Sequence, residues 1–204
     1  GGGRRDGQTL PAHWSAGLKP VPRPRTVGLD ACVLVPPTLC TLWMRLAEAP
    51  SLCRLAWSAR TLEELHRTWT TGLPRPWPAA SATRMLSLLR TAYPEAEIAA
   101  DPELERSLSN HPKDRHVLAA AIQAQADAIV TFNRKDFPAS ALSPWKVRVV
   151  HPDEFLLSLY RSHPDETLQR VRGIIGRRTM AETLEALLRH APGFVAAIRK
   201  DAAE

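Results

Sequence analysis

The chain has 204 residues, of which 44% are hydrophobic, so it is long enough for one domain with a substantial core, with or without an appendage. No apolar run reaches the ~18 residues of a membrane span, and we find no secretory signal pattern, so we expect neither a membrane protein nor an exported one. The formal net charge is +6, but residues 1–25 carry five basic residues against one acid, whereas the other 179 carry 22 against 20. The overall basicity is therefore weak support for nucleic-acid binding.

Residues 1–25 contain five glycines and four prolines and show no apolar periodicity. This composition cannot bury enough apolar surface to fold by itself. We interpret the segment as a disordered tail, or as residues foreign to the natural chain, rather than as a nucleic-acid-binding arm.

The cysteines Cys32, Cys40 and Cys53 are odd in number and lack the spacing of a metal site. Their usage predicts a reduced protein of the cytoplasm.

Residues 26–29 are predicted to form a strand that ends at Asp30, and Pro36 and Pro37 open a helix. One face of this helix carries Leu39, Leu42, Trp43 and Leu46. A strand, a carboxylate at its carboxyl end and a crossover helix form the first half of a βαβ unit. Alone, Asp30 fits a turn or cap residue as well as it fits a ligand.

Residues 53–57 are predicted to form the second strand, with Ser58 as the N-cap of a helix that continues through Trp69. The buried stripe of this helix consists of Leu62, Leu65 and Trp69. Glu63 and Glu64 lie off this stripe, so periodicity predicts a solvated face for both. A loop over 69–79, an amphipathic helix over 80–92 and a short helix over 102–108 follow.

The stretch 110–137 carries polar side chains at both ends of one helix–strand unit. Asp114 begins a helix and shares its face with the core residues Val117, Leu118 and Ala121. A carboxylate there must cap the helix or face a cation, because burying an unpaired charge is costly. The following strand, 128–132, ends at Asn133, and Asp136 lies three residues further on.

A last strand is predicted over 146–150, and beyond residue 150 the pattern is purely helical. The predicted helices cover 152–161, 164–177, 180–190 and 193–200. This region is balanced in charge, with eight basic and eight acidic residues. We interpret it as a packing appendage or a partner-binding surface.

Alternating strands and helices predict an α/β fold with a mainly parallel sheet, in which Asp30, Asn133 and Asp136 share the carboxyl edge. Asp114 is expected to reach that edge only if the connection before its helix folds back over it. Several converging carboxylates repel one another unless a hard divalent ion such as Mg²⁺ or Mn²⁺ lies among them. His111 and His116 lack a second ligand at usable spacing, and we interpret them as surface residues or as neighbours of the ligands.

Four blocks in order carry a resemblance to a known family: VGLDACVLVPP, WSARTLEELHR, DRHVLAAAIQAQADAIVTFNRKDFP and VVHPDEFL. They resemble the PIN-domain ribonucleases, in particular a bacterial branch of VapC-type toxins with a helical C-terminal extension. The resemblance covers about residues 26–160. It implies a three-layer α/β/α nuclease domain over 26–150 and a helical extension over 151–204.

The resemblance also implies an acidic site. Its first three acids fall on Asp30, Glu64 and Asp114, and only the resemblance selects Glu64 over its neighbour. The fourth position falls on Asn133, with Asp136 close by, so the implied catalytic acids are Asp30, Glu64, Asp114 and Asp136, and Asn133 joins them as a metal ligand.

The chain departs from the family pattern at four positions. Cys32 stands where many members have Asn or Ser, and Asn133 is neutral. His111 and Lys113 occupy positions where relatives often place acids.

The implied activity is Mg²⁺-dependent hydrolysis of RNA, with Mn²⁺ as a substitute ion, by the toxin of a type II toxin–antitoxin pair. An antitoxin protein is the implied partner, and the sequence does not decide between a monomer and a homodimer. Arg115, Arg134 and Lys135 could contact RNA phosphates or form a solvated face. Two alternatives remain: a non-catalytic or RNA-processing protein of the same fold that binds partners, and a phosphoacceptor regulator that uses Asp30.

Overall fold

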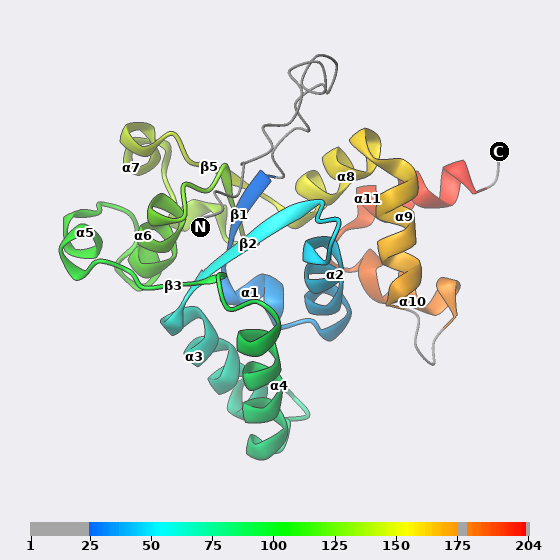
Figure 1. The fold of residues 1–204 in the computed structure, drawn as a ribbon, viewed down its shortest axis with the longest axis horizontal. Helices are drawn as coiled ribbons and strands as arrows, with labels where there is room; N and C mark the ends of the chain where they lie inside the picture. Colours follow the sequence, from blue (N-terminus) through cyan, green and yellow to red (C-terminus); the bar gives the residue numbers. More distant parts are fainter. Residues whose placement is uncertain (1–24, 175–178, 203–204) are drawn as a thin grey trace, which may run out of the picture.

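The computed structural model describes residues 25–174 and 179–202, and at its centre lies a five-stranded, all-parallel sheet (Figure 1). The strand order is β3-β2-β1-β4-β5. The strands are β1 (Arg25–Leu29), β2 (Cys53–Ser58), β3 (Glu97–Ile98), β4 (Ala128–Val130) and β5 (Arg148–Val150). The tail predicted over 1–25 falls, except for Arg25, outside the described residues, and so does the end of the helix predicted over 164–177.

Helices surround this sheet and also continue beyond its last strand. The α-helices are α1 (Ala31–Leu34), α2 (Pro37–Ala47), α3 (Ala59–Arg67), α4 (Ala79–Ala92), α5 (Pro102–Ser107), α6 (Arg115–Gln123), α7 (Ala139–Leu142), α8 (Pro152–Ser162), α9 (Pro164–Gly173), α10 (Met180–Leu188) and α11 (Pro192–Asp201). Single turns of other helix types are η2 (Thr68–Gly72), η3 (Pro112–Asp114), η4 (Arg134–Asp136) and η5 (Ser143–Trp145).

Both faces of the sheet are buried, as expected for parallel strands whose crossover connections are helical. Val27, Leu29 and Val130 face the larger core, which contains residues of α2, α3, α4, α8, α10 and α11. Ile129 faces a smaller core formed with α6. This three-layer arrangement confirms the α/β class predicted from the sequence.

Helix α6 runs antiparallel to the strands. Its first turn contacts the end of β2, through His116 and Ser58, whereas Asp127, which follows the helix, donates its backbone N–H to the carbonyl of Thr26 at the start of β1. The helix also packs closely on the sheet, because a Cβ placed on Gly28 would lie 3.1 Å from Cβ of Ala121. The amino end of α6, with Asp114, therefore lies at the carboxyl edge of the sheet. The connection before it runs to the other end of α6, where the N–H of Asp101 donates to Gln123, and then returns to this edge, as the sequence had led us to expect.

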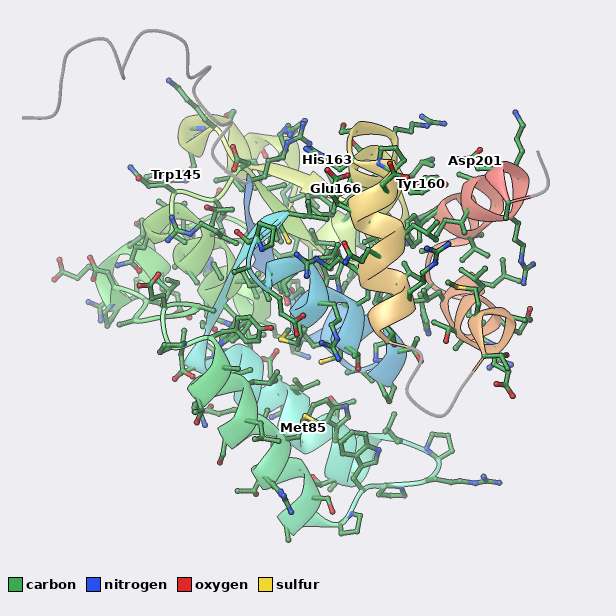
Figure 2. All side chains as sticks on the ribbon, turned by 45° about the vertical axis from the view of Figure 1, so that its right-hand side comes forward. Met85, Trp145, Tyr160, His163, Glu166 and Asp201 are labelled. Atoms are coloured by element: carbon green, nitrogen blue, oxygen red, sulfur yellow. The ribbon has the colours of Figure 1, made fainter. Side chains whose placement is uncertain are left out.

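The C-terminal helices share the larger core with the sheet-covering helix α2. Trp43 of α2 packs against Phe155 of α8, with ring centroids 5.6 Å apart. Helix α11 is attached to α8 at its amino end, where Asp153 accepts hydrogen bonds from the backbone N–H groups of Gly193 and Phe194. Near its carboxyl end, Tyr160 donates a 2.7 Å hydrogen bond to Asp201 (Figure 2).

Several local predictions differ from the structure. The loop predicted over 69–79 begins with the turn η2, and the short edge strand β3 was not predicted. Helix α4 buries Leu86 and Leu89, but Met85 and Leu88 of the same predicted apolar set are 36% and 54% exposed. Figure 2 labels Met85 on this helix. Among residues 25–174 and 179–202, none of the helices combines the length and apolar character needed to cross a membrane.

Candidate active site

Asp30 follows β1 directly, and its carboxylate is held by groups from two neighbouring strand ends. It is only 7% exposed. The hydroxyl of Thr131 donates to its Oδ2 over 2.6 Å, and the Sγ of Cys32 donates to the same oxygen over 3.1 Å. Burial and the neighbouring Asp30 raise the pKa of Cys32 to about 12, so the thiol stays protonated and remains a donor. Cys32 thus performs the supporting role that the resemblance assigns to Asn or Ser.

Glu64 lies on α3, and its side chain is 25% exposed, in contrast to the exposed side chain of Glu63. Its Oε1 lies 3.4 Å from Nε2 of His116. Burial raises the pKa of Glu64, but His116, Arg60 and Arg67 together outweigh burial and lower it. The solvated face predicted from periodicity is therefore wrong for Glu64, because α6 covers this side of α3.

Asp114 occupies the N-cap position of α6, but its side chain makes no capping hydrogen bond. Its Oδ2 lies 3.4 Å from Nδ1 of His111. Burial raises the pKa of Asp114, and the negative charges of Asp30, Asp136 and Glu64 raise it further. Asp114 is therefore within electrostatic reach of the three other acids at one edge of the sheet.

Beyond β4, Asn133 precedes the turn η4 and Asp136 is the last residue of this turn. The side-chain amide of Asn133 donates a hydrogen bond to Oδ2 of Asp136. Backbone bonds tie this turn to the segment before α6, since the N–H of His111 donates to the carbonyl of Asp136 over 3.1 Å. Asp136 is half-buried and acts electrostatically on Asp114, whereas Asn133 is exposed. The inward-facing side chain of the pair is Asp136.

The donor set suits a hard divalent ion. Four carboxylates supply only oxygen atoms, and their mutual repulsion at Asp114 is what a cation would relieve. Within the described ranges, no three His, Cys, Asp or Glu side chains lie close enough together to hold a metal ion as they stand, so the acids would have to turn toward one another to share one. Protein groups hold three of the carboxylates instead: Thr131 at Asp30, Asn133 at Asp136 and His116 at Glu64.

The basic side chains predicted to contact RNA have different surroundings. Arg134 is paired with both carboxylate oxygens of Glu154, at 2.9 and 3.1 Å. Nε of Arg115 donates to the carbonyl of Asn110 over 3.4 Å, and Lys135 is exposed.

A second group of basic side chains, which the sequence did not single out, lies beside Glu64. There an open hollow of about 440 Å³ is lined by Arg60, Glu63, Glu64, Arg67 and Lys113. Arg60 is held by a 2.7 Å ion pair with Glu105. For the side chains of Arg67 and Lys113, the described part of the chain offers no hydrogen bond or ion pair. This hollow is therefore the better candidate for binding phosphate.

Sequence reasoning also missed Thr131 and Ser58. Thr131 was assigned only to a strand, although its position two residues before Asn133 could have marked it as a group at the strand end. Ser58 was correctly predicted as an N-cap, since its Oγ accepts from the N–H of Thr61, but its contact with His116 joins residues 58 positions apart and leaves no local signal.

Residues 27–135 match the family described as "PIN domain". Over 139 residues the chain is 36% identical to "Putative ribonuclease VapC50" of Mycobacterium tuberculosis (strain ATCC 25618 / H37Rv), a match that covers 66% of this chain and 79% of the relative. No solved structure gives a significant match. The family resemblance drawn from the four sequence blocks is thereby confirmed.

Proposed function

The chain belongs to the PIN-domain family, and we propose that it is an endoribonuclease in which Asp30, Glu64, Asp114 and Asp136 hold a magnesium-type ion for hydrolysis of RNA phosphodiesters. The 36% identity to a protein named as a ribonuclease supports RNA as the substrate. The inference that these residues form the site rests on their arrangement.

One observation carries the proposal: burial raises the pKa of Asp114, and the negative charges of Asp30, Asp136 and Glu64, which come from three separate parts of the chain, raise it further. A protein gains no stability from bringing four carboxylates together, because like charges at short range repel. Such clusters are found where a cation or a reaction requires them. The acids also lie at the carboxyl edge of a parallel sheet, where ligands bind in open α/β folds.

The acids have distinct proposed roles. Asp30 and Asp114 would hold the ion directly, and Asp136, with Asn133 beside it, would supply further oxygen ligands. Glu64 would bind the ion through a water molecule or orient the attacking water. When bound, Mg²⁺ or Mn²⁺ supplies positive charge that activates water and offsets the charge developing on the phosphate. The products expected from the family resemblance carry a 5′-phosphate and a 3′-hydroxyl.

The RNA strand is proposed to leave the acidic site over the hollow beside Glu64. Arg67 and Lys113 present cationic groups there at the edge of the acids. Contacts of this kind bind the phosphate backbone without reading its sequence. Arg134 is less suited, because Glu154 already neutralises it.

The family resemblance and the name of the relative further support a toxin that is inhibited by a protein antitoxin. Expression of the chain alone in a bacterium is expected to stop growth, and expression of the Asp30→Asn variant to permit it. Unimpeded growth with soluble, RNA-cleaving protein would contradict the toxin role but leave the nuclease proposal standing.

The nuclease proposal is tested by incubating the protein with single-stranded RNA and Mg²⁺. Asp30→Asn and Asp114→Asn are each expected to lower the cleavage rate by at least about a hundredfold. Glu64→Gln and Glu63→Gln form a matched pair, because the two residues are neighbours on α3 and only Glu64 lies among the acids. Equal cleavage by all of these variants would overturn the assignment.

A further inference from the structure

His116 is a buried side chain that links the end of β2 to the acidic site. It lies in the first turn of α6 and is 1% exposed. Its Nδ1 is 2.6 Å from Oγ of Ser58, and its Nε2 is 3.4 Å from Oε1 of Glu64. Within the described chain, Nε2 has no hydrogen-bond partner of good geometry, although it lies close to that carboxylate. A buried polar atom in this position calls for a functional explanation.

The contacts of the ring indicate where its proton lies. The bare lone pair of an imidazole nitrogen would repel the carboxylate of Glu64, whereas an N–H attracts it, so Nε2 carries the proton. In the neutral ring Nδ1 is then an acceptor. Oγ of Ser58 already accepts from the backbone N–H of Thr61 over 3.1 Å, and its hydroxyl proton bonds Nδ1 when the hydroxyl of Thr61, also 3.1 Å away, donates to Oγ.

We propose that His116 is a positioning residue: Ser58 fixes its ring so that the Nε2–H is aimed at Glu64 and holds that carboxylate toward the ion-binding acids. This inference rests on the proposed function, since it gives the held carboxylate its purpose. The 3.4 Å separation between Nε2 and Oε1 is long for a hydrogen bond, but such separations commonly shorten when a site is loaded.

The alternative is a purely structural role, in which His116 only joins α6 to the N-cap of α3. The two roles depend on opposite ends of the ring. A structural link needs Nδ1 and its bond to Ser58, whereas positioning also needs a donor at the place of Nε2.

The protein without metal gives the first test. A two-bond ¹H–¹⁵N correlation spectrum of the unmodified chain identifies which ring nitrogen of His116 carries the proton. We expect a protonated Nε2. A bare Nε2 with the proton on Nδ1 would overturn the proposal, whether or not the protein cleaves RNA.

Two substitutions give the second test, since glutamine and asparagine each reproduce one end of the ring. In His116→Gln the side-chain amide reaches the place of Nε2, whereas in His116→Asn it reaches only the place of Nδ1. With Mn²⁺ as the probe in calorimetry, we expect His116→Gln to keep the affinity within about threefold and His116→Asn to lose about tenfold or more. Equal affinities, or the reverse order, would overturn the positioning role.

The outcomes separate this inference from the proposed function. If the unmodified protein binds no Mn²⁺ at millimolar concentration, the metal-dependent nuclease fails, and the positioning role fails with it because Glu64 would then have no ion to serve. If it binds Mn²⁺ and Asp30→Asn abolishes binding, the site is established and the order of the two His116 variants decides the inference alone.

Discussion

The hydroxyl of Thr131 donates a 2.6 Å hydrogen bond to Oδ2 of Asp30, and so joins the first residue beyond β4 to the first residue beyond β1. The strand register creates this contact, since Leu29 pairs with Val130 in the sheet. Cys32 donates to the same oxygen. In the described structure the side-chain hydrogen bonds of Asp30 therefore fall on Oδ2, which leaves Oδ1 for a ligand.

Thr131→Val preserves the shape of the buried side chain but removes this donor, together with the acceptor of a 2.9 Å hydrogen bond from the backbone N–H of Asn133. Asp30 would keep only the weaker thiol donor and would lose its fixed orientation. We expect the affinity for Mn²⁺ and the rate of RNA cleavage to fall about tenfold, and the free energy of unfolding to fall by about 1–3 kcal/mol. Calorimetric metal titration and urea denaturation measure the two effects.

Thr167→Val is the matched control for that substitution. Thr167 is also fully buried, but its hydroxyl has no hydrogen-bond partner in the described structure. Its replacement should leave the free energy of unfolding unchanged or slightly raised, because an unsatisfied polar group is removed. If both variants behave alike, the bond from Thr131 does not orient Asp30.

Asp114→Asn is expected to stabilise the protein in the absence of divalent ions, while it abolishes cleavage. The raised pKa of Asp114 means that the native state binds its proton more tightly than the unfolded state does. The native protein therefore loses stability as pH rises from the ordinary pKa of 3.8 through the raised value. The variant avoids this loss, so its advantage should be absent below pH 3.8 and complete above the raised pKa.

At neutral pH we expect the advantage to be about 1 kcal/mol, or about 2–4 °C in Tm. Thermal melts of both proteins in chelator across this pH range test it. Saturating Mn²⁺ should reverse the order, because only the unmodified protein gains a ligand. If the variant is less stable than the unmodified chain at neutral pH without metal, the carboxylates do not repel Asp114 strongly enough to destabilise the native state.

Much of the fold follows from local patterns in the sequence. The strand before Asp30, the helix with Leu39, Leu42, Trp43 and Leu46, and the N-cap at Ser58 all occur as predicted, because each depends on residues within one or two turns. The C-terminal helices were also predicted within a few residues in the described ranges, since Pro at N1 marks three of their starts.

The site was less predictable, because its contacts join distant parts of the chain. The helical periodicity predicted that Glu63 and Glu64 would both be exposed to solvent. Only Glu64 is partly covered, because α6 packs against its side of α3. Nothing near Arg134 in the sequence revealed that Glu154, 20 residues away, would neutralise it. The direction of α6 also depends on packing between distant parts of the chain. Because this helix runs antiparallel to the strands, Asp114 at its amino end lies at the carboxyl edge of the sheet.

Substitutions of basic side chains should show which side of the site binds RNA. Replacement of Arg67 or Lys113 by Gln is expected to weaken binding at low salt and to lower the slope of log K against log salt by about 0.7 for each phosphate interaction removed. Arg134→Gln should change the slope less, since its guanidinium is paired with Glu154. Fluorescence anisotropy with a labelled single-stranded RNA and the inactive Asp30→Asn background measures the slopes. A larger effect at Arg134 would place the strand on the opposite side of the acids.

Phe194→Ala tests whether the C-terminal helices and the sheet unfold as one unit. Phe194 is fully buried in the larger core and packs edge-on against Tyr160. Its truncation should cost about 3–5 kcal/mol, whereas Leu88→Ala, at an exposed position on α4, should change stability by less than about 0.5 kcal/mol.

The chain offers a clean probe for this experiment, because none of its six tryptophans lies in residues 151–204. Tryptophan fluorescence therefore reports on the part of the chain before residue 151, and far-UV circular dichroism on all helices. Since residues of α2 and α11 share one core, we expect both signals to follow a single urea transition, shifted to lower urea in Phe194→Ala. An early transition in dichroism, with only the partial change in fluorescence that exposure of Trp43 would cause, would mean that the C-terminal helices unfold separately.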